Sequence, residues 1–179
     1  MHPRIAELSQ FLEAQHDVVR HAFESVPPFA RERVPAAGGW SVANVIEHLA
    51  VVEKRVAMRI AASIGEARNA GLPRETSADP ILPTVDVARL LDRGNKISAP
   101  DAIHPTGLGA DAAWDALMQS WEIVRGTLID ADGFAIGMLA MPHPVLGTAS
   151  LYQWFAFVGG HEARHASQIR EIGQLVVSH

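Results

Sequence analysis

The chain contains no cysteine among its 179 residues, and this absence excludes several kinds of chemistry. A disulfide, a thiolate metal ligand and a cysteine nucleophile all require the missing side chain. Basic residues are also scarce, because 15 Lys and Arg are set against 20 Asp and Glu, for a net charge of −5. A general nucleic-acid surface needs clustered Lys and Arg. We therefore expect neither a disulfide scaffold nor a nucleic-acid partner.

Long apolar runs are absent as well. No run approaches the roughly 18 residues that a transmembrane helix requires. The N-terminus, from Met1 to Ile5, lacks the apolar stretch and the cleavage site of a signal peptide. Apolar residues make up 48% of the chain and charged residues 20%, as is usual for a soluble globular protein. We expect a cytoplasmic protein without membrane contact, in which residues 1–179 form a single domain.

Strand-like alternation and internal repeats are also missing, whereas helical periodicity is strong. Four stretches repeat apolar residues at spacings of three and four, the pattern of an amphipathic helix. These stretches are residues 5–26, 42–64, 111–131 and 149–177. Ser41 and Asp111 are placed to cap the second and the third helix. The sequence therefore predicts an all-α fold, a four-helix bundle.

The second and third predicted helices are joined by a long irregular connection, residues 65–110, which is rich in proline and glycine. We expect a short helix from Thr84 to Arg93 to interrupt it. Connections of this length are unusual in a compact domain and are often functional. This one would either let the second and third helices run side by side in the same direction, or cover a cleft.

The fourth predicted helix carries a pair of histidines, His161 and His165. Residues four apart on an α-helix lie on the same face, about 6 Å apart along the axis. Both histidines continue the apolar face, where their ring nitrogens find few partners, and a shared divalent metal ion would satisfy them. The alternative is a helix edge at which both rings reach water.

A third histidine, His48, lies at the edge of the apolar face of the second predicted helix. If the second and fourth helices pack together, its imidazole can converge with those of His161 and His165. Three nitrogen ligands and a water form an open, catalytic type of zinc site, whereas closed structural sites use four protein ligands. The alternative is that His48 only packs in the core.

The segment from His161 to His165 also matches H-E-x-x-H, the metalloprotease pattern in which the glutamate acts as general base. The extended pattern needs a glycine at position 168 and a histidine at position 171, where the chain has Gln168 and Glu171. No distant downstream glutamate is available as a ligand either, so we do not expect a peptidase. Glu162 would face the site as a base or lie on a solvated surface, and we favour the surface.

Two other histidines stand near these patterns. His16 belongs to the apolar face of the first predicted helix, and we expect a core residue that is hydrogen-bonded to a neighbour rather than a ligand. His143 lies in a proline-rich loop between the third and fourth helices. Whether His16, His143 or Glu162 contributes to a metal site stays open at this point.

Two segments resemble known family motifs. The stretch WSVANVIEHLAVVE, from Trp40 to Glu53, resembles the second-helix motif of the DinB-like superfamily of metal-dependent enzymes, which is distinct from the DNA polymerase of that name. The loop and final-helix signature of that superfamily is matched by HPVLG from His143, by YQW from Tyr152, and by H-x3-H-x2-Q-I from His161.

This resemblance implies a four-helix bundle in which His48, His161 and His165 bind a divalent metal ion, zinc or nickel being the usual ones. Characterised members of the superfamily include thiol S-transferases that act with bacillithiol or mycothiol, a maleylpyruvate isomerase and metal-dependent hydrolases. Many members are dimers. The resemblance therefore implies a small-molecule substrate, with a low-molecular-weight thiol as one candidate, and a homodimer as a candidate assembly.

Three functions remain open from the sequence. The first is a metal-dependent enzyme, a transferase or hydrolase, that activates a water or a low-molecular-weight thiol against a small molecule. The second is a non-catalytic metal- or ligand-binding helical bundle. The third is a helical interaction protein with metal-free histidines, which we rank last because three core-facing histidines are predicted to converge.

Overall fold

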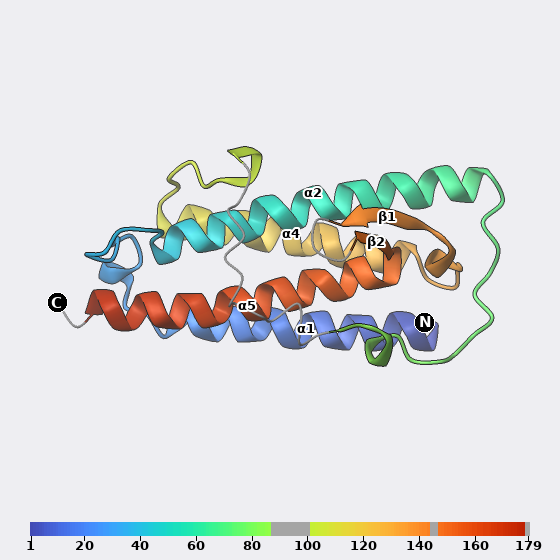
Figure 1. Cartoon of the computed structure of the whole chain (residues 1–179), viewed down its shortest axis with the longest axis horizontal. Coiled ribbons are helices and arrows are strands. Elements are labelled where there is room, and N and C mark those ends of the chain that lie inside the picture. Colours follow the sequence, from blue (N-terminus) through green and yellow to red (C-terminus); the bar gives the residue numbers. More distant parts are fainter. Residues whose placement is uncertain (87–100, 144–146, 178–179) are drawn as a thin grey trace.

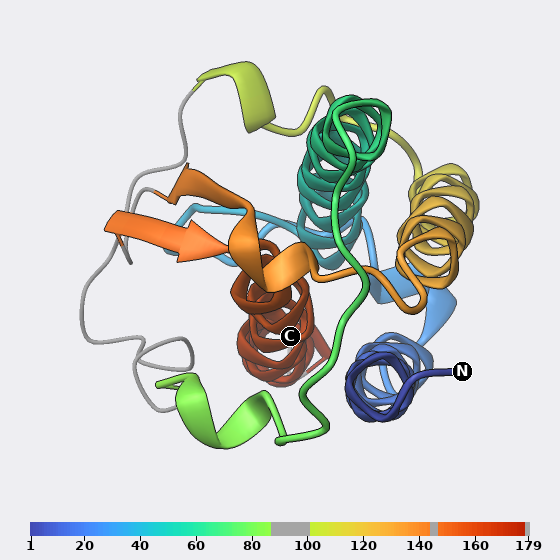
Figure 2. The ribbon, with the colours of Figure 1, turned by 90° about the vertical axis from the view of Figure 1, so that its right-hand side faces the viewer.

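Four long helices form the computed structural model, which describes residues 1–86, 101–143 and 147–177 (Figure 1). The four helices are α1 (Pro3–Glu24), α2 (Val42–Asn69), α4 (Ala110–Asp130) and α5 (Leu151–Val177). α1 packs against α5 and α2 packs against α4. The helices of each pair run in the same direction, and the two pairs run in opposite directions (Figures 1 and 2). The predicted all-α four-helix bundle is confirmed.

Local sequence explains where two of these helices, α2 and α5, begin. At the start of α2, the Ser41 hydroxyl accepts a hydrogen bond from the Asn44 amide, and the Asn44 side chain accepts one from the Ser41 amide. Ser150 and Gln153 exchange the same pair of bonds at the start of α5. These reciprocal bonds satisfy amides that lack partners in the first turn.

The predicted cap of α4 is wrong. The helix begins one residue before Asp111, and the amide of Ala110 donates to the carboxylate of Glu32, 2.9 Å away. Glu32 lies in the segment between α1 and α2, which also contains the short 3-10 helix η1 (Pro28–Ala30). A carboxylate that is distant in the sequence thus caps the helix, and Asp111 lies in its first turn.

The long connection lets α2 and α4 run side by side in the same direction, one of its two predicted roles (Figure 1). Its described parts include two 3-10 helices, η2 (Leu82–Thr84) and η3 (Asp101–Ile103). Most of the short helix expected from Thr84 to Arg93 lies outside the described residues.

A small β-hairpin precedes α5, although sequence analysis predicted no strand. Strands β1 (Ala140–His143) and β2 (Gly147–Ser150) pair antiparallel and follow the 3-10 helix η4 (Ile136–Met138). Each strand has four residues and β1 contains a proline, so neither shows a usable alternation of apolar and polar residues. The hairpin forms because Met141 and Ala149 bury their side chains in the core.

The apolar core divides into two clusters along the bundle. One cluster fills the end where α1 and α5 begin, and the other fills the end where α2 and α4 begin. Where the clusters meet, all four long helices contribute buried polar residues, among them His16, Glu53, Ser120 and Glu162. Over the described residues, none of the helices combines the length and apolar character of a membrane span.

Candidate metal centre

Three histidines from two helices converge beside the middle of the bundle. His48 extends from α2, and His161 and His165 extend from α5. One ring nitrogen of each lies within 4.8 Å of those of the other two. The centre of the His48 ring is 5.3 Å from that of His161 and 5.0 Å from that of His165. The structure thus brings together the three residues that the sequence singled out.

Hydrogen bonds fix which nitrogen of two of these rings would serve as a metal ligand. Nδ1 of His48 donates to the carbonyl oxygen of Ile103, 2.8 Å away, and Nδ1 of His165 donates to Oε1 of Gln168, also 2.8 Å away. Burial lowers the pKa of His48, which keeps the ring neutral. With the proton on Nδ1, Nε2 of each ring carries a lone pair, as a metal ligand requires.

The third ring, that of His161, completes the donor set. Its Nε2 lies 3.1 Å from Nε2 of His165. A tetrahedral ion bound at about 2.0–2.1 Å would hold two ligand nitrogens about 3.3 Å apart, so this spacing fits one. Burial lowers the pKa of His161, and the neighbouring His165, His48 and Arg164 lower it further, so the ring is neutral. The buried Nδ1 of His161 has no hydrogen-bond partner in the described part of the chain.

Aromatic rings lie on two sides of the three histidines. The Trp40 ring centre lies 4.9 Å from that of His48, and the Phe157 ring stacks on His161 at 5.4 Å with the two planes 23° apart. His104, an exposed loop residue, meets the edge of Trp40 at 6.0 Å. These rings replace water around the histidines and strengthen electrostatic interactions there.

Glu47, next to His48 in the sequence, holds the loop from Thr106 to Leu108. Its carboxylate accepts hydrogen bonds from the amide and hydroxyl of Thr106 and from the amides of Gly107 and Leu108, at 2.6–3.0 Å. Burial alone would raise the pKa of Glu47, but these bonds outweigh it and hold the pKa below its ordinary value. This loop follows Ile103, the partner of His48. Sequence analysis missed Glu47, because nothing in the local pattern shows which way its side chain turns.

Both sequence-based expectations for Glu162 are wrong. The residue is 0% exposed, and its Oε1 lies 2.8 Å from Nδ1 of the buried His16. It therefore pairs with a core residue instead of acting as a base on the three-histidine site. The reason is that α5 is buried on several faces, so a side chain rotated away from the histidines still points into protein. The prediction that His16 is a hydrogen-bonded core residue is confirmed.

A second buried carboxyl group, that of Glu53, lies near Glu162. The buried side chains of Glu53 and Glu162 lie close enough for the charge of one to act on the other. Burial raises the pKa of Glu162 to about 8, and burial together with the charge of Glu162 raises that of Glu53 well above its ordinary value. The pair therefore carries fewer than two negative charges at neutral pH.

His143 lies at the end of β1 and takes no part in the group of three histidines. Its ring meets the edges of Phe157 and Trp154, with centres 4.2 Å and 4.5 Å away. The residue is 4% exposed, and burial lowers its pKa to about 4. His143 is thus a neutral neighbour of Phe157, the residue that stacks on His161.

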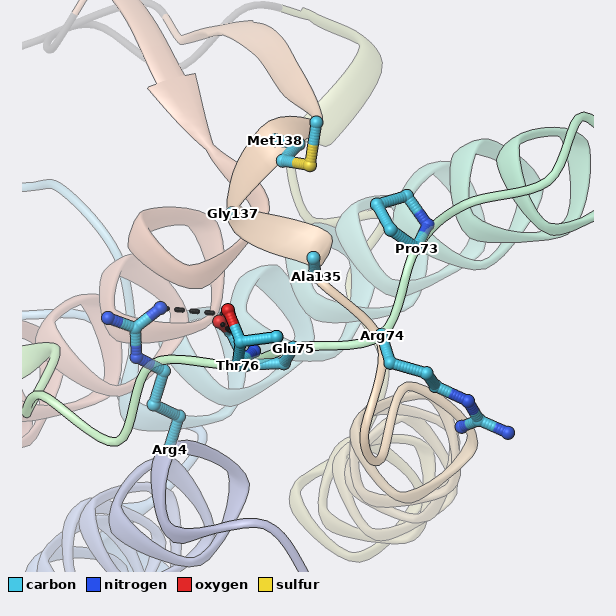
Figure 3. Close-up of a pocket in the computed structure, with 8 residues that line it drawn as sticks. All are labelled: Arg4, Pro73, Arg74, Glu75, Thr76, Ala135, Gly137 and Met138. Atoms are coloured by element: carbon cyan, nitrogen blue, oxygen red, sulfur yellow. Dashed lines mark hydrogen bonds and ion pairs between the residues drawn. The ribbon is translucent and has the colours of Figure 1, made fainter.

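A separate cavity of about 450 Å³ lies at the end of the bundle where α1 begins and α2 ends (Figure 3). Its lining consists of Arg4, residues 73–76, Ala135, Gly137 and Met138. Arg4 is paired with Glu75 at 2.8 Å, and Arg74 points away from that pair (Figure 3). The cavity contains none of the histidines, and its charged groups do not converge on a common point.

Comparison with known proteins places this geometry in a family. The DinB superfamily matches residues 10–169, a span that contains His48, His161 and His165. The chain belongs to the DinB superfamily. YuaE of Bacillus subtilis (strain 168), an uncharacterized protein, is 28% identical to this DinB-superfamily chain over 147 residues, which cover 79% of the chain and 82% of YuaE. No solved structure shows significant similarity to this chain.

Proposed function

We propose that this DinB-superfamily protein is a metal-dependent enzyme that holds zinc or nickel on His48, His161 and His165. One observation carries the proposal: Ile103 and Gln168 each accept a hydrogen bond from Nδ1 of a histidine, His48 and His165 respectively. Bonds of this kind orient the ligands of metal sites. Histidines that served only as packing residues would have no need to share a common focus.

The proposed chemistry follows from the ligand set. Three protein ligands leave a coordination position open, which is typical of catalytic sites. A divalent ion there would supply the Lewis acidity that makes a water or a low-molecular-weight thiol nucleophilic near neutral pH. The partner would be a small electrophile, and the reaction a thiol transfer or a hydrolysis.

The residues of the chain would contribute position and environment. Trp40 and Phe157 would offer apolar contacts to a small molecule beside the histidines. Glu47 would hold the loop from Thr106 to Leu108 in place, so that the carbonyl of Ile103 stays on His48.

The first test is the metal content of the purified protein, measured by elemental mass spectrometry. We expect about one zinc or nickel ion per chain, as a single three-histidine site would hold. The double variant His161→Ala, His165→Ala should contain none, whereas His21→Ala, which changes an exposed histidine on α1, should match the parent. A parent protein that stays metal-free after incubation with several divalent ions would overturn the proposal.

The second test is a reaction screen of the loaded protein with candidate thiols and a chlorinated nitroarene, and with activated esters for hydrolysis. We expect turnover above background with at least one combination, and its loss in His48→Ala. Metal binding without any turnover would contradict an enzymatic function.

The second candidate function is a non-catalytic metal-binding bundle. It is favoured by the position of the histidines, since an ion bound there would tie α2 to α5. A ligand that is present at 1,000 times its Kd stabilises the folded state by about 4 kcal/mol. This candidate predicts a large fall in Tm on chelation together with an inactive protein.

A further inference from the structure

The buried polar residues between the two apolar clusters form one layer across the whole bundle. His16 of α1, Glu53 of α2, Ser120 of α4 and Glu162 of α5 are 6%, 1%, 1% and 0% exposed. We call these four residues the polar layer. On every long helix, the residues of one apolar cluster precede the layer and those of the other follow it or lie around it.

The members of the layer are joined by direct contacts. Glu162 bonds to His16 at 2.8 Å and lies close to Glu53, and the hydroxyl of Ser120 donates to Glu53 at 3.1 Å. The ring of His16 stacks on Trp121 of α4 at 4.4 Å, with the planes 5° apart. These contacts link α5 to α1, α1 to α4 and α4 to α2 at a single level.

On α5, that level is also the level of His161 and His165. Glu162 directly follows His161 and precedes His165 by three residues, so the position of Glu162 sets the direction of both rings. A shift of α5 by one residue would rotate its side chains by about 100°. Such a shift would press the carboxyl group of Glu162 against apolar side chains without its partners, which is costly. An apolar interior would penalise the same shift far less.

We propose that the polar layer is the positioning device of the metal centre: it fixes the rotation and register of α5 so that His161 and His165 face His48. Buried polar residues select one register in other helical assemblies, at a cost in stability. Glu162 is here a positioning residue that acts through the backbone of α5. The inference rests on the proposed metal binding.

The test replaces the whole layer with apolar residues of similar size: His16→Leu, Glu53→Met, Ser120→Ala and Glu162→Met. We expect the Tm of the metal-free variant to equal or exceed that of the parent, because well-packed apolar residues often replace buried ionic groups without loss of stability. Cobalt(II) serves as the probe. Its affinity should fall by about tenfold or more, as when the supporting contacts of a metal site are lost, and its d–d absorption should change.

Controls separate positioning from general stability. Ile169→Val removes a buried methyl group from α5 one turn beyond His165, and we expect a lower Tm with unchanged cobalt affinity. Unchanged affinity and absorption in the apolar-layer variant would overturn the inference, whereas a parent that binds no cobalt would overturn the proposed function itself. A second bound cobalt ion that is lost with Glu53→Met would also overturn the positioning inference, because the polar layer would then itself bind metal.

Single variants keep the test decisive if the fourfold variant does not fold. Glu162→Gln retains an oxygen that can accept from His16, whereas Glu162→Met does not. We expect the Gln variant to bind cobalt with affinity close to that of the parent, and the Met variant to lose about tenfold. Equal cobalt affinities in the two variants would contradict a positioning role.

Discussion

Oε1 of Gln168 lies 2.8 Å from Nδ1 of His165, three residues before it on α5. The contact is local, so the helix itself fixes the partner of this imidazole. Because the amide oxygen only accepts, Nδ1 of His165 must carry the proton and Nε2 the lone pair. The orientation of one histidine at the centre is thus set by its own helix, whereas that of His48 depends on the carbonyl of Ile103, a distant loop residue.

Replacement of Gln168 by alanine should weaken metal binding without unfolding the protein. Loss of a supporting bond typically costs 10- to 100-fold in metal affinity, and we expect about this loss in Gln168→Ala, measured by competition with a chelating dye. Gln168→Glu keeps an acceptor and should retain most of the affinity. Ser167→Ala changes a neighbouring residue that does not contact the three histidines in the described structure, and this variant should bind metal like the parent. Equal affinities for Gln168→Ala and Ser167→Ala would contradict this role.

Replacement of Glu47 by alanine should release the loop that follows Ile103. Hydrogen bonds to a charged group contribute about 1.5–3 kcal/mol, and we expect Glu47→Ala to lower the free energy of unfolding by about this amount. Hydrogen exchange at the amides of Thr106, Gly107 and Leu108 should become faster, since these amides lose their acceptor. Glu66→Ala, an exposed change on α2, is the control. Unchanged exchange at these amides would show that the loop is held by other contacts.

His143 should make the stability of the metal-free protein depend on pH. The folded-state pKa of His143 is about 4, below its ordinary value of 6.5, so below pH 6.5 the unfolded chain takes up a proton that the folded chain does not. The free energy of unfolding should therefore fall as the pH falls from 6.5 to 4. Above pH 6.5 the stabilising contribution of the neutral His143 is fully present. In His143→Gln the loss should be smaller by up to about 1.4 kcal/mol per pH unit, measured by urea unfolding. His21→Gln, at an exposed position, should keep the parental slope. Parallel slopes for His143→Gln and the parent would contradict the prediction.

Two glycines should respond in opposite ways to the same substitution. A Cβ atom at Gly173 of α5 would lie 2.6 Å from Cγ2 of Val26, a buried residue just after α1, whereas one at Gly126 of α4 would meet nothing within 4 Å. We expect Gly173→Ala to destabilise the protein by about 1–3 kcal/mol through overpacking. Gly126→Ala should stabilise it by about 0.5–1 kcal/mol, because alanine loses less backbone entropy in a helix. Thermal unfolding of both variants measures the two effects, and a stabilised Gly173→Ala would contradict the close packing of α1 and α5.

Features with short-range physical causes were predictable from the sequence. The helical periodicity predicted four long helices, and the capping residue Ser41 predicted where α2 begins. The three histidines could be named because their side chains follow the apolar faces of α2 and α5, and those faces turn toward the same interior. That these residues bind a metal remains a prediction.

The positions of side chains that depend on distant partners were decided only by the tertiary structure. Glu162 turns to His16, Glu47 turns to the loop at Thr106, and Glu32 caps α4, in each case across a long stretch of chain. A carboxylate is usually solvated, so sequence analysis favours the surface for it. Only the packing of helices and loops around it supplies the hydrogen-bond donors that compensate for the loss of hydration on burial. The periodicity of the sequence thus determined which faces meet, and the tertiary structure decided which polar groups meet between them.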